Sequence, residues 1–256
     1  MKVVILAGGY GTRISEESHL IPKPMIEIGG KPMLWHIMNY YAAHGLNEFI
    51  IAAGYKAEYI KNYFLNYYAI NNDISIDLIN NKTIIYDGKQ PNWKIHILDT
   101  GLGTQTGGRI KRVKKMLEGE ENFMLAYGDG LIDMNMTDFM KFHNSHGKLA
   151  SVTAVRPPAR FGRISIDGCK VCEFNEKPDM DQGWINGGFF IVNKKVIDYI
   201  DGDQTVWERE PIERIAREDQ LMCYQHQGFW SCMDTLKEKN IIEEYWNSGK
   251  APWKIW

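Results

Sequence analysis

The sequence predicts an α/β fold with a Rossmann-like, mostly parallel sheet flanked by helices, in a single domain over residues 1–256. Short apolar runs of strand type alternate with stretches of helical period, and the connections between them are short. Two turn-rich segments interrupt this alternation and indicate β-hairpin insertions. No internal repeat, low-complexity tract or linker divides the chain, which is long enough to bury a substantial core.

The N-terminal half begins with the clearest strand and helix signals. Residues 2–7 are almost continuously apolar and end in glycines, as in a buried parallel strand. Residues 32–43 place apolar side chains on one face of a helix that Gly45 closes. The same reasoning predicts strands at 48–53, 95–98 and 123–126, and helices at 58–67, 109–117 and 137–146.

The two hairpin segments and the C-terminal elements complete the pattern. Residues 70–91 are rich in Asn and Asp, with a turn pair at Asn80-Asn81, and predict either a β-hairpin or a long loop. Residues 163–174 predict a second hairpin that turns at Asp167-Gly168. Further strands are predicted at residues 149–155 and after Ile185. Helices at 196–200 and 208–218 follow, and then a strand and a last helix at 235–246.

Composition and charge exclude several classes of function. The chain carries 30 Lys and Arg against 32 Asp and Glu, for a net charge of −2, so no global field attracts nucleic acid or an anionic membrane. No apolar run approaches the roughly 18 residues that span a bilayer, and the first apolar stretch is too short for a signal peptide. We therefore expect a cytoplasmic protein without a nucleic-acid or membrane partner.

The four cysteines do not predict a disulfide framework. Cys169 and Cys172 have the C-x-x-C spacing of half a zinc site, but Cys223 and Cys232 are not closely spaced. We interpret Cys172 and its neighbours as strand residues of a hairpin.

The most informative segment is the glycine loop after the first strand, Gly8-Gly9-Tyr10-Gly11-Thr12-Arg13. Three glycines let the backbone curl and present N–H groups to phosphate oxygens, and an arginine can hold a phosphate by two hydrogen bonds. A Walker A loop would need Gly-Lys followed by Ser or Thr, which is missing. A dinucleotide fingerprint fails because Ile14 stands where its third glycine belongs.

A lysine held between two prolines, Pro22-Lys23-Pro24, follows the glycine loop. Both prolines restrict the backbone, which suits an ammonium group that must meet a fixed anion. Asp129 stands between two glycines, directly after a predicted strand. Ligands of parallel sheets bind at this carboxyl end of the strands. Asp234 is a second carboxylate, which by itself could equally be the N-cap of the last helix. Magnesium usually takes one or two such carboxylates.

The segment from Thr104 to Arg109 opens a helix, where glycines can expose free N–H groups to a ligand. Cationic side chains continue along that helix, and we interpret them as a solvated face on which only Arg109 is functional. The two histidines of the 137–146 helix, His143 and His146, are interpreted as surface or packing residues.

Together these segments resemble the sugar nucleotidyltransferases along nearly the whole chain. Within that family the likeness is closest to the glucose-1-phosphate cytidylyltransferase branch. It is carried by the G-G-x-G-T-R loop, the P-K-P segment, Glu27-Ile28-Gly29-Gly30-Lys31-Pro32, Thr106-Gly107-Gly108-Arg109, Tyr127-Gly128-Asp129-Gly130, Ile185-Asn186-Gly187-Gly188-Phe189-Phe190, Gly228-Phe229-Trp230, Met233-Asp234-Thr235 and Ala251-Pro252-Trp253-Lys254. The fold implied is nucleotide-diphospho-sugar transferase-like.

The resemblance also implies roles for individual residues. Arg13 and Lys23 are the expected catalytic cations, and Asp129 and Asp234 the expected ligands of a Mg²⁺ cofactor. The expected nucleotide-binding residues are Leu6, Ala7, Gly8, Gly9, Gly11, Thr12, Arg13, Lys23, Thr104, Gly108, Arg109 and Asp129. The expected sugar-phosphate-binding residues are Glu176, Lys177, Asn186 and Gly187.

The implied reaction transfers CMP from CTP to glucose 1-phosphate, giving CDP-glucose, an entry to the dideoxy sugars of bacterial O-antigen, and pyrophosphate. The same reaction with dTTP or UTP stays open, because the residues alone do not reveal an acceptor for the cytosine amino group. A more distant alternative is a non-catalytic sensor subunit, although the expected cations and carboxylates are all present. Relatives form tetramers or hexamers, so a homo-oligomer is expected, with Trp246, Trp253 and Trp256 either at subunit contacts or in the core.

Overall fold

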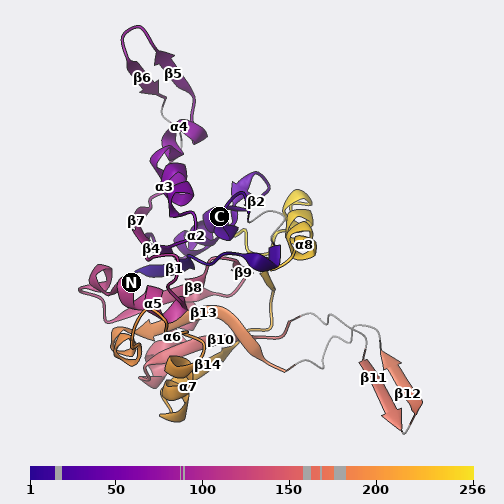
Figure 1. Ribbon diagram of the computed structural model, residues 1–256. Helices are drawn as coiled ribbons and strands as arrows, with labels where there is room; N and C mark the ends of the chain where they lie inside the picture. The colour runs from indigo at the N-terminus through magenta and orange to yellow at the C-terminus, as the bar shows by residue number, and fades with distance from the viewer. Residues whose placement is uncertain (15–18, 87, 89, 158–162, 168, 176–182) are drawn as a thin grey trace.

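The computed structural model describes residues 1–14, 19–86, 88, 90–157, 163–167, 169–175 and 183–256. Its centre is a seven-stranded sheet with helices on both faces (Figure 1). In spatial order the strands are β14 (Leu221–Gln225), β10 (Ala150–Val155), β13 (Ile185–Asn193), β8 (Asn122–Tyr127), β1 (Val3–Ala7), β4 (Glu48–Ala53) and β7 (Lys94–Asp99).

The sheet is mostly parallel, as the sequence predicts. Parallel pairing joins β1 to β4 and β8, β4 to β7, and β10 to β14. Strand β13 departs from the prediction, because it runs antiparallel to both β8 and β10. It pairs there because the chain returns from the second hairpin rather than through a crossover helix, which parallel pairing would need.

Alternating side chains of β1 build two cores, one on each face of the sheet. Val3, Ile5 and Ala7 pack into the larger core, and Val4 and Leu6 into the smaller one. All five are buried, which explains why this strand is apolar at every position.

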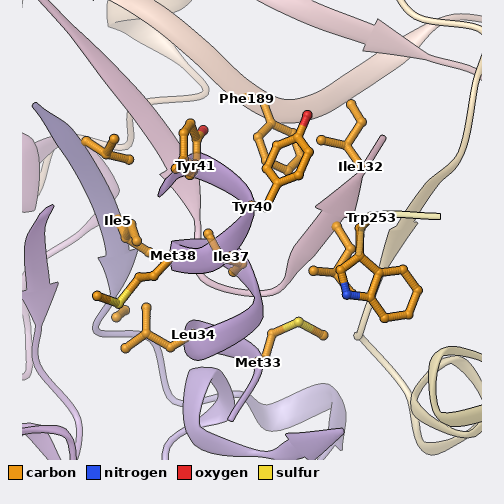
Figure 2. Packing of buried hydrophobic residues seen from close by; sticks show 14 of the residues in the cluster. Ile5, Met33, Leu34, Ile37, Met38, Tyr40, Tyr41, Ile132, Phe189 and Trp253 are labelled. Carbon is orange, nitrogen blue, oxygen red and sulfur yellow. The ribbon is translucent and has the colours of Figure 1, made fainter. Parts of the chain in front are cut away.

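Helices on opposite faces of the sheet cover the two cores. The larger core is covered by α2 (Met33–Ala43), α3 (Ala57–Leu65), α6 (Met136–His146) and α8 (Leu236–Asn247). The smaller core is covered by α5 (Thr106–Arg112), the 3₁₀ helices η3 (Lys114–Leu117) and η4 (Lys194–Tyr199), and α7 (Glu210–Arg217). Figure 2 shows Leu34, Ile37 and Met38 of α2 close to Ile5 of β1.

Both predicted hairpins form. The first consists of β5 (Ile74–Asp77) and β6 (Lys82–Ile85), and Asn81 in its turn has a positive φ of 49°. This hairpin projects from the body beyond α3 and α4 (Tyr67–Asn71) (Figure 1). The second consists of β11 (Arg163–Asp167) and β12 (Lys170–Asn175), and Gly168 of its predicted turn lies outside the described residues.

Several boundaries differ from the sequence prediction. The helix predicted at 109–117 begins earlier, at Thr106, and its end is the separate helix η3. The helix predicted at 58–67 breaks at Asn66, and α4 follows it. Two short ladders are additional, β2 (Glu27–Ile28) with β3 (Lys31–Pro32), and β9 (Gly130–Ile132) with β15 (Trp230–Cys232). Their strands are too short to show a periodic pattern.

The C-terminal segment packs back onto α2. Trp253 is fully buried in the larger core, and Trp246 is partly buried against it (Figure 2 labels Trp253). Trp256 remains exposed, at 37% of its surface. In the described part of the chain, no helix combines the length and apolar character needed to cross a bilayer.

Candidate active site

A cleft of about 750 Å³ lies at the carboxyl ends of β1 and β8. It is lined by twelve residues that the sequence singles out, namely Leu6, Ala7, Gly8, Gly9, Gly11, Thr12, Lys23, Thr104, Arg109, Asp129, Asn186 and Asp234. These residues come from segments spread over the whole chain. Ligands of parallel sheets bind at this edge, so the cleft is the candidate active site.

Lys23, Asp129 and Asp234 form the charged centre of the cleft. The ammonium Nζ of Lys23 donates to Oδ2 of Asp129 by a short contact and to Oδ1 of Asp234 at 2.6 Å. Burial opposes the charged form of Lys23, but the two carboxylates outweigh it and hold its pKa above the ordinary lysine value. The lysine is therefore an ammonium ion at neutral pH, bound to two carboxylates at once.

The short ladder of β9 and β15 brings the two carboxylates together. Gly130 pairs with Cys232 in this ladder, and the N–H of Met233 donates to the carbonyl of Asp129 at 2.9 Å. Asp129 precedes β9 and Asp234 follows β15, so the pairing fixes their separation. This ladder was not predicted, and it explains how residues 105 positions apart converge.

The N-cap of α8 is Thr235 rather than Asp234, which settles the alternative reading of that carboxylate. The Thr235 hydroxyl accepts from the N–H of Glu238 at 3.2 Å, and the Glu238 carboxylate accepts from the N–H of Thr235 at 2.9 Å. Glu238 also accepts from the N–H of Asp234 at 2.9 Å. The capping box thus holds the Asp234 backbone and leaves its side chain to meet Lys23.

The proline-flanked lysine is anchored against Gly128. A β-carbon at Gly128 would lie 2.9 Å from Cγ of Pro24 and 2.8 Å from the carbonyl oxygen of Leu6. Only glycine lets the two segments approach this closely. The missing side chain of Gly128 therefore lets the lysine segment pack directly beside Asp129.

Arg109 is buried beneath the glycine loop. Its guanidinium donates to the carbonyls of Gly8, Ala53 and Gly101 at 2.9, 3.2 and 2.9 Å, and to the Thr100 hydroxyl at 2.6 Å. Burial lowers the pKa of Arg109 from its ordinary value. Arg109 lines the cleft, but in this arrangement its principal contacts tie the glycine loop to the ends of β4 and β7.

The glycines at the start of α5 serve packing. The N–H of Gly108 is not free, because it donates to the carbonyl of Thr205 at 3.2 Å. A β-carbon at Gly108 would lie 2.5 Å from the carbonyl oxygen of Asp203, and one at Gly107 would lie 2.7 Å from that of Thr205. The expectation of exposed donors at this helix start is wrong for Gly108, which does not line the cleft.

A hydrogen-bond network on the cleft wall was missed at the sequence level. Glu208 accepts from the Tyr127 hydroxyl at 2.7 Å and from the Thr106 hydroxyl at 2.6 Å. The side-chain amide of Asn186 donates to the Tyr127 oxygen at 3.2 Å. Burial, followed by the Glu208 charge, raises the pKa of Tyr127. Tyr127 stands beside Gly128-Asp129 and could have been found there, but no motif marked Glu208.

The other expected site residues have different placements. Gly187 is buried, and its carbonyl accepts from the indole N–H of Trp230 at 2.8 Å. Arg13 lies in the 3₁₀ helix η1 (Thr12–Ile14) at the end of the glycine loop. Glu176 and Lys177 lie outside the described residues.

The residues interpreted as packing, surface or strand groups have the following placements. His143 is buried and its Nδ1 lies 2.9 Å from the Ser151 hydroxyl, so it packs within the fold. The cations that follow Arg109 are exposed, namely Lys111, Arg112, Lys114 and Lys115, and Arg112 pairs with Asp203. Cys172 lies in β12.

The carboxylate pair suits a magnesium ion that shares its ligands with a phosphorylated substrate. Magnesium prefers oxygen ligands and commonly takes one or two carboxylates together with substrate phosphates. Asp129 and Asp234 supply two carboxylates that already converge on one cation. Within the described ranges, no set of three or more His, Cys, Asp or Glu residues is placed to hold a metal without such help.

Comparison with known proteins defines the class. The nucleotidyl transferase family model matches residues 2–246, and the chain belongs to that family. Glucose-1-phosphate cytidylyltransferases of Salmonella typhi and Salmonella typhimurium are each 48% identical over 256 residues, covering all of both chains. Among solved structures, HddC from Yersinia pseudotuberculosis is 25% identical with a TM-score of 0.70, covering 96% of this chain and 99% of its own.

Proposed function

We propose that this protein transfers CMP from CTP to α-D-glucose 1-phosphate and releases CDP-glucose and pyrophosphate. The observation that carries the proposal is the convergence of the glycine loop, Lys23, Asp129 and Asp234 in one cleft. The full-length identity of 48% with two glucose-1-phosphate cytidylyltransferases supports the choice of substrates.

The reaction requires positioning and charge neutralisation rather than a protein nucleophile. A phosphate oxygen of the sugar phosphate attacks the α-phosphorus of the nucleotide in line, and the bond to pyrophosphate breaks. The phosphate dianion is already nucleophilic, so no general base is needed. The protein must therefore hold two polyanions together and stabilise the charge that develops between them.

The residues of the cleft divide this work. In the proposal the glycine loop and Arg13 bind the β- and γ-phosphates, while Lys23 neutralises the α-phosphate. Thr104 and Arg109 contribute to nucleotide binding from the opposite wall. Asp129 and Asp234 are the proposed ligands of magnesium, which supplies positive charge to phosphate oxygens when bound.

The sugar phosphate is proposed to lie toward Asn186, at the start of β13. Glu176 and Lys177 are proposed to bind the sugar hydroxyls and the phosphate. Gly187 was expected to offer accessible backbone to the sugar, but it is buried and its carbonyl is held by Trp230, so it has no part in this proposal. The Tyr127–Glu208 network beside Asn186 fixes the amide, since the Tyr127 oxygen accepts from it. Fixed polar groups select among hexoses because an unmade buried hydrogen bond is costly.

Turnover across four nucleoside triphosphates and several hexose 1-phosphates tests the proposal directly. Pyrophosphate release in the presence of Mg²⁺ should be fastest with CTP and glucose 1-phosphate. A clear preference for dTTP or UTP would reassign the base, and no release with any pair would favour a non-catalytic sensor.

Further properties belong to the same proposal. We infer a Mg²⁺ requirement, a cytoplasmic location where nucleoside triphosphates are made, and a product used for O-antigen dideoxy sugars. We also infer a homo-oligomer, either a hexamer or a tetramer. The exposed apolar residues Ile76, Leu78 and Ile79 on the β5–β6 hairpin support self-association, and light scattering would measure its stoichiometry.

A further inference from the structure

We propose that Lys23 occupies the metal-binding position in the nucleotide-free protein and keeps its affinity for divalent cations low until nucleotide binds. This inference rests on the proposed function, because it concerns the same carboxylate pair. It adds a competition between an ammonium group of the chain and the metal ion.

The contacts of Lys23 define the competition. Its Nζ is bound by Oδ2 of Asp129 and by Oδ1 of Asp234. These are oxygens of the two carboxylates on which a divalent cation would depend. A cation that binds both carboxylates must therefore displace the ammonium group.

Charge and burial make the displacement unfavourable for the free protein. Side-chain exposure is 12% for Lys23, 27% for Asp129 and 20% for Asp234, so the three groups are largely removed from water. An ammonium ion pushed away from both carboxylates in such a place loses its partners without regaining full hydration. The metal must supply that cost from its own binding free energy.

The backbone around Lys23 is fixed, whereas its side chain can move. Pro22 has φ −66° and ψ 142°, and its carbonyl accepts from the N–H of Met25 at 2.7 Å. The lysine side chain is a flexible stem that ends in a compact charge. It can therefore swing between two anions, from the carboxylates to a phosphate in the same cleft, without a change of fold.

A nucleotide phosphate removes the obstacle by offering the ammonium a second anion. Once Lys23 binds phosphate, its ammonium group no longer competes with the metal for Asp129 and Asp234. Nucleotide and metal then strengthen each other's binding, and this coupling is reciprocal. The charge pair thus links metal entry to substrate binding.

Manganese binding to the nucleotide-free, full-length protein tests the inference, with electron paramagnetic resonance reporting free Mn²⁺. Lys23→Met keeps most of the length of the side chain and removes its charge. We expect it to bind Mn²⁺ more tightly than the wild type, by about 5-fold to 150-fold, the ordinary range of coupling between sites. An unchanged or weaker affinity would overturn the inference.

Matched variants separate local competition from general electrostatics. Lys111→Met also removes one positive charge, but the Lys111 ammonium donates to the carbonyls of Ile200 and Asp201. It should leave Mn²⁺ affinity unchanged, and an equal gain would overturn the inference. Adding Asp129→Asn to Lys23→Met should abolish the gain, and a gain that persists would place the metal elsewhere and refute the competition.

Folding and catalysis are checked separately. If the Lys23→Met variant does not fold, Lys23→Gln replaces it. Mg²⁺ should raise the thermal midpoint of either variant more than that of the wild type. Pyrophosphate release by the wild type tests the proposed function alone. An active wild type with no gain in the lysine variants would refute only the competition, whereas an inactive wild type with a clear gain would refute only the reaction.

Discussion

Replacing Arg109 with methionine tests whether this arginine supports the glycine loop from below. The guanidinium donates four hydrogen bonds, to the carbonyls of Gly8, Ala53 and Gly101 and to the Thr100 hydroxyl. Methionine fills much of the same volume and donates none of them. The expected result is a less stable protein with a loosened glycine loop.

The magnitude follows from which of these acceptors keep another donor among the described residues. The Ala53 carbonyl still accepts from the N–H of Thr100 at 2.8 Å, and the Gly8 carbonyl from that of Tyr55 at 3.2 Å. The Gly101 carbonyl and the Thr100 hydroxyl lose the charged donor. The Thr100 hydroxyl still donates to the Ala53 carbonyl, so the cost is that of two lost acceptor bonds, about 2–4 kcal/mol together. For a chain of this length, that loss lowers the thermal midpoint by roughly 5–15 °C.

Urea denaturation and steady-state kinetics measure the two consequences together. The free energy of unfolding should fall by about 2–4 kcal/mol, and KM for CTP should rise about tenfold because the loop is no longer pre-organised. Arg112→Met is the matched control on the same helix, since Arg112 is exposed and pairs with Asp203; it should change neither quantity. If Arg109→Met raises KM without any loss of stability, the supporting role is refuted and Arg109 acts on the nucleotide alone.

Three further predictions address the loop, a buried histidine and a helix cap. Gly8→Ala should lower the thermal midpoint, because its β-carbon would lie 2.1 Å from the buried guanidinium of Arg109. Gly9→Ala is the matched control, since its β-carbon meets nothing within 4 Å, and it should raise only KM for CTP. Equal losses of stability in the two variants would contradict this. Burial lowers the pKa of His36 from 6.5 to about 4, so the unfolded chain binds the extra proton. The free energy of unfolding in urea should therefore fall by up to about 3 kcal/mol as pH drops from about 6.5 to 4, and His36→Gln should flatten this dependence. Thr235→Ala should cost about 1 kcal/mol in urea denaturation, and Thr235→Ser should restore most of it if capping is the cause.

The fold was predictable from the sequence wherever an element is long and apolar. The run at residues 2–7 and the helix at 32–43 were located within a residue or two, because burial imposes a period on such segments. The direction of β13 was not predictable, because strand polarity depends on the connecting path. The β9–β15 ladder escaped prediction because its strands have only three residues each.

The candidate site was predictable in its composition but not in its internal contacts. The glycine loop, Lys23 and Asp129 carry recognisable local chemistry, and one cleft contains them. Whether a glycine admits a ligand or a neighbouring backbone depends on tertiary packing, which is why Gly108 was misread. Glu208 has no local signature, and its contacts with Tyr127 and Thr106 place it on the cleft wall.

The rate of pyrophosphate release by Asp129→Ala, with CTP, glucose 1-phosphate and Mg²⁺, tests most directly the claim that this cleft performs nucleotidyl transfer. If Asp129 helps to neutralise charge between the two polyanions, the variant should be slower than the wild type by about 10²-fold or more. A folded Asp129→Ala protein that releases pyrophosphate at nearly the wild-type rate would contradict that claim.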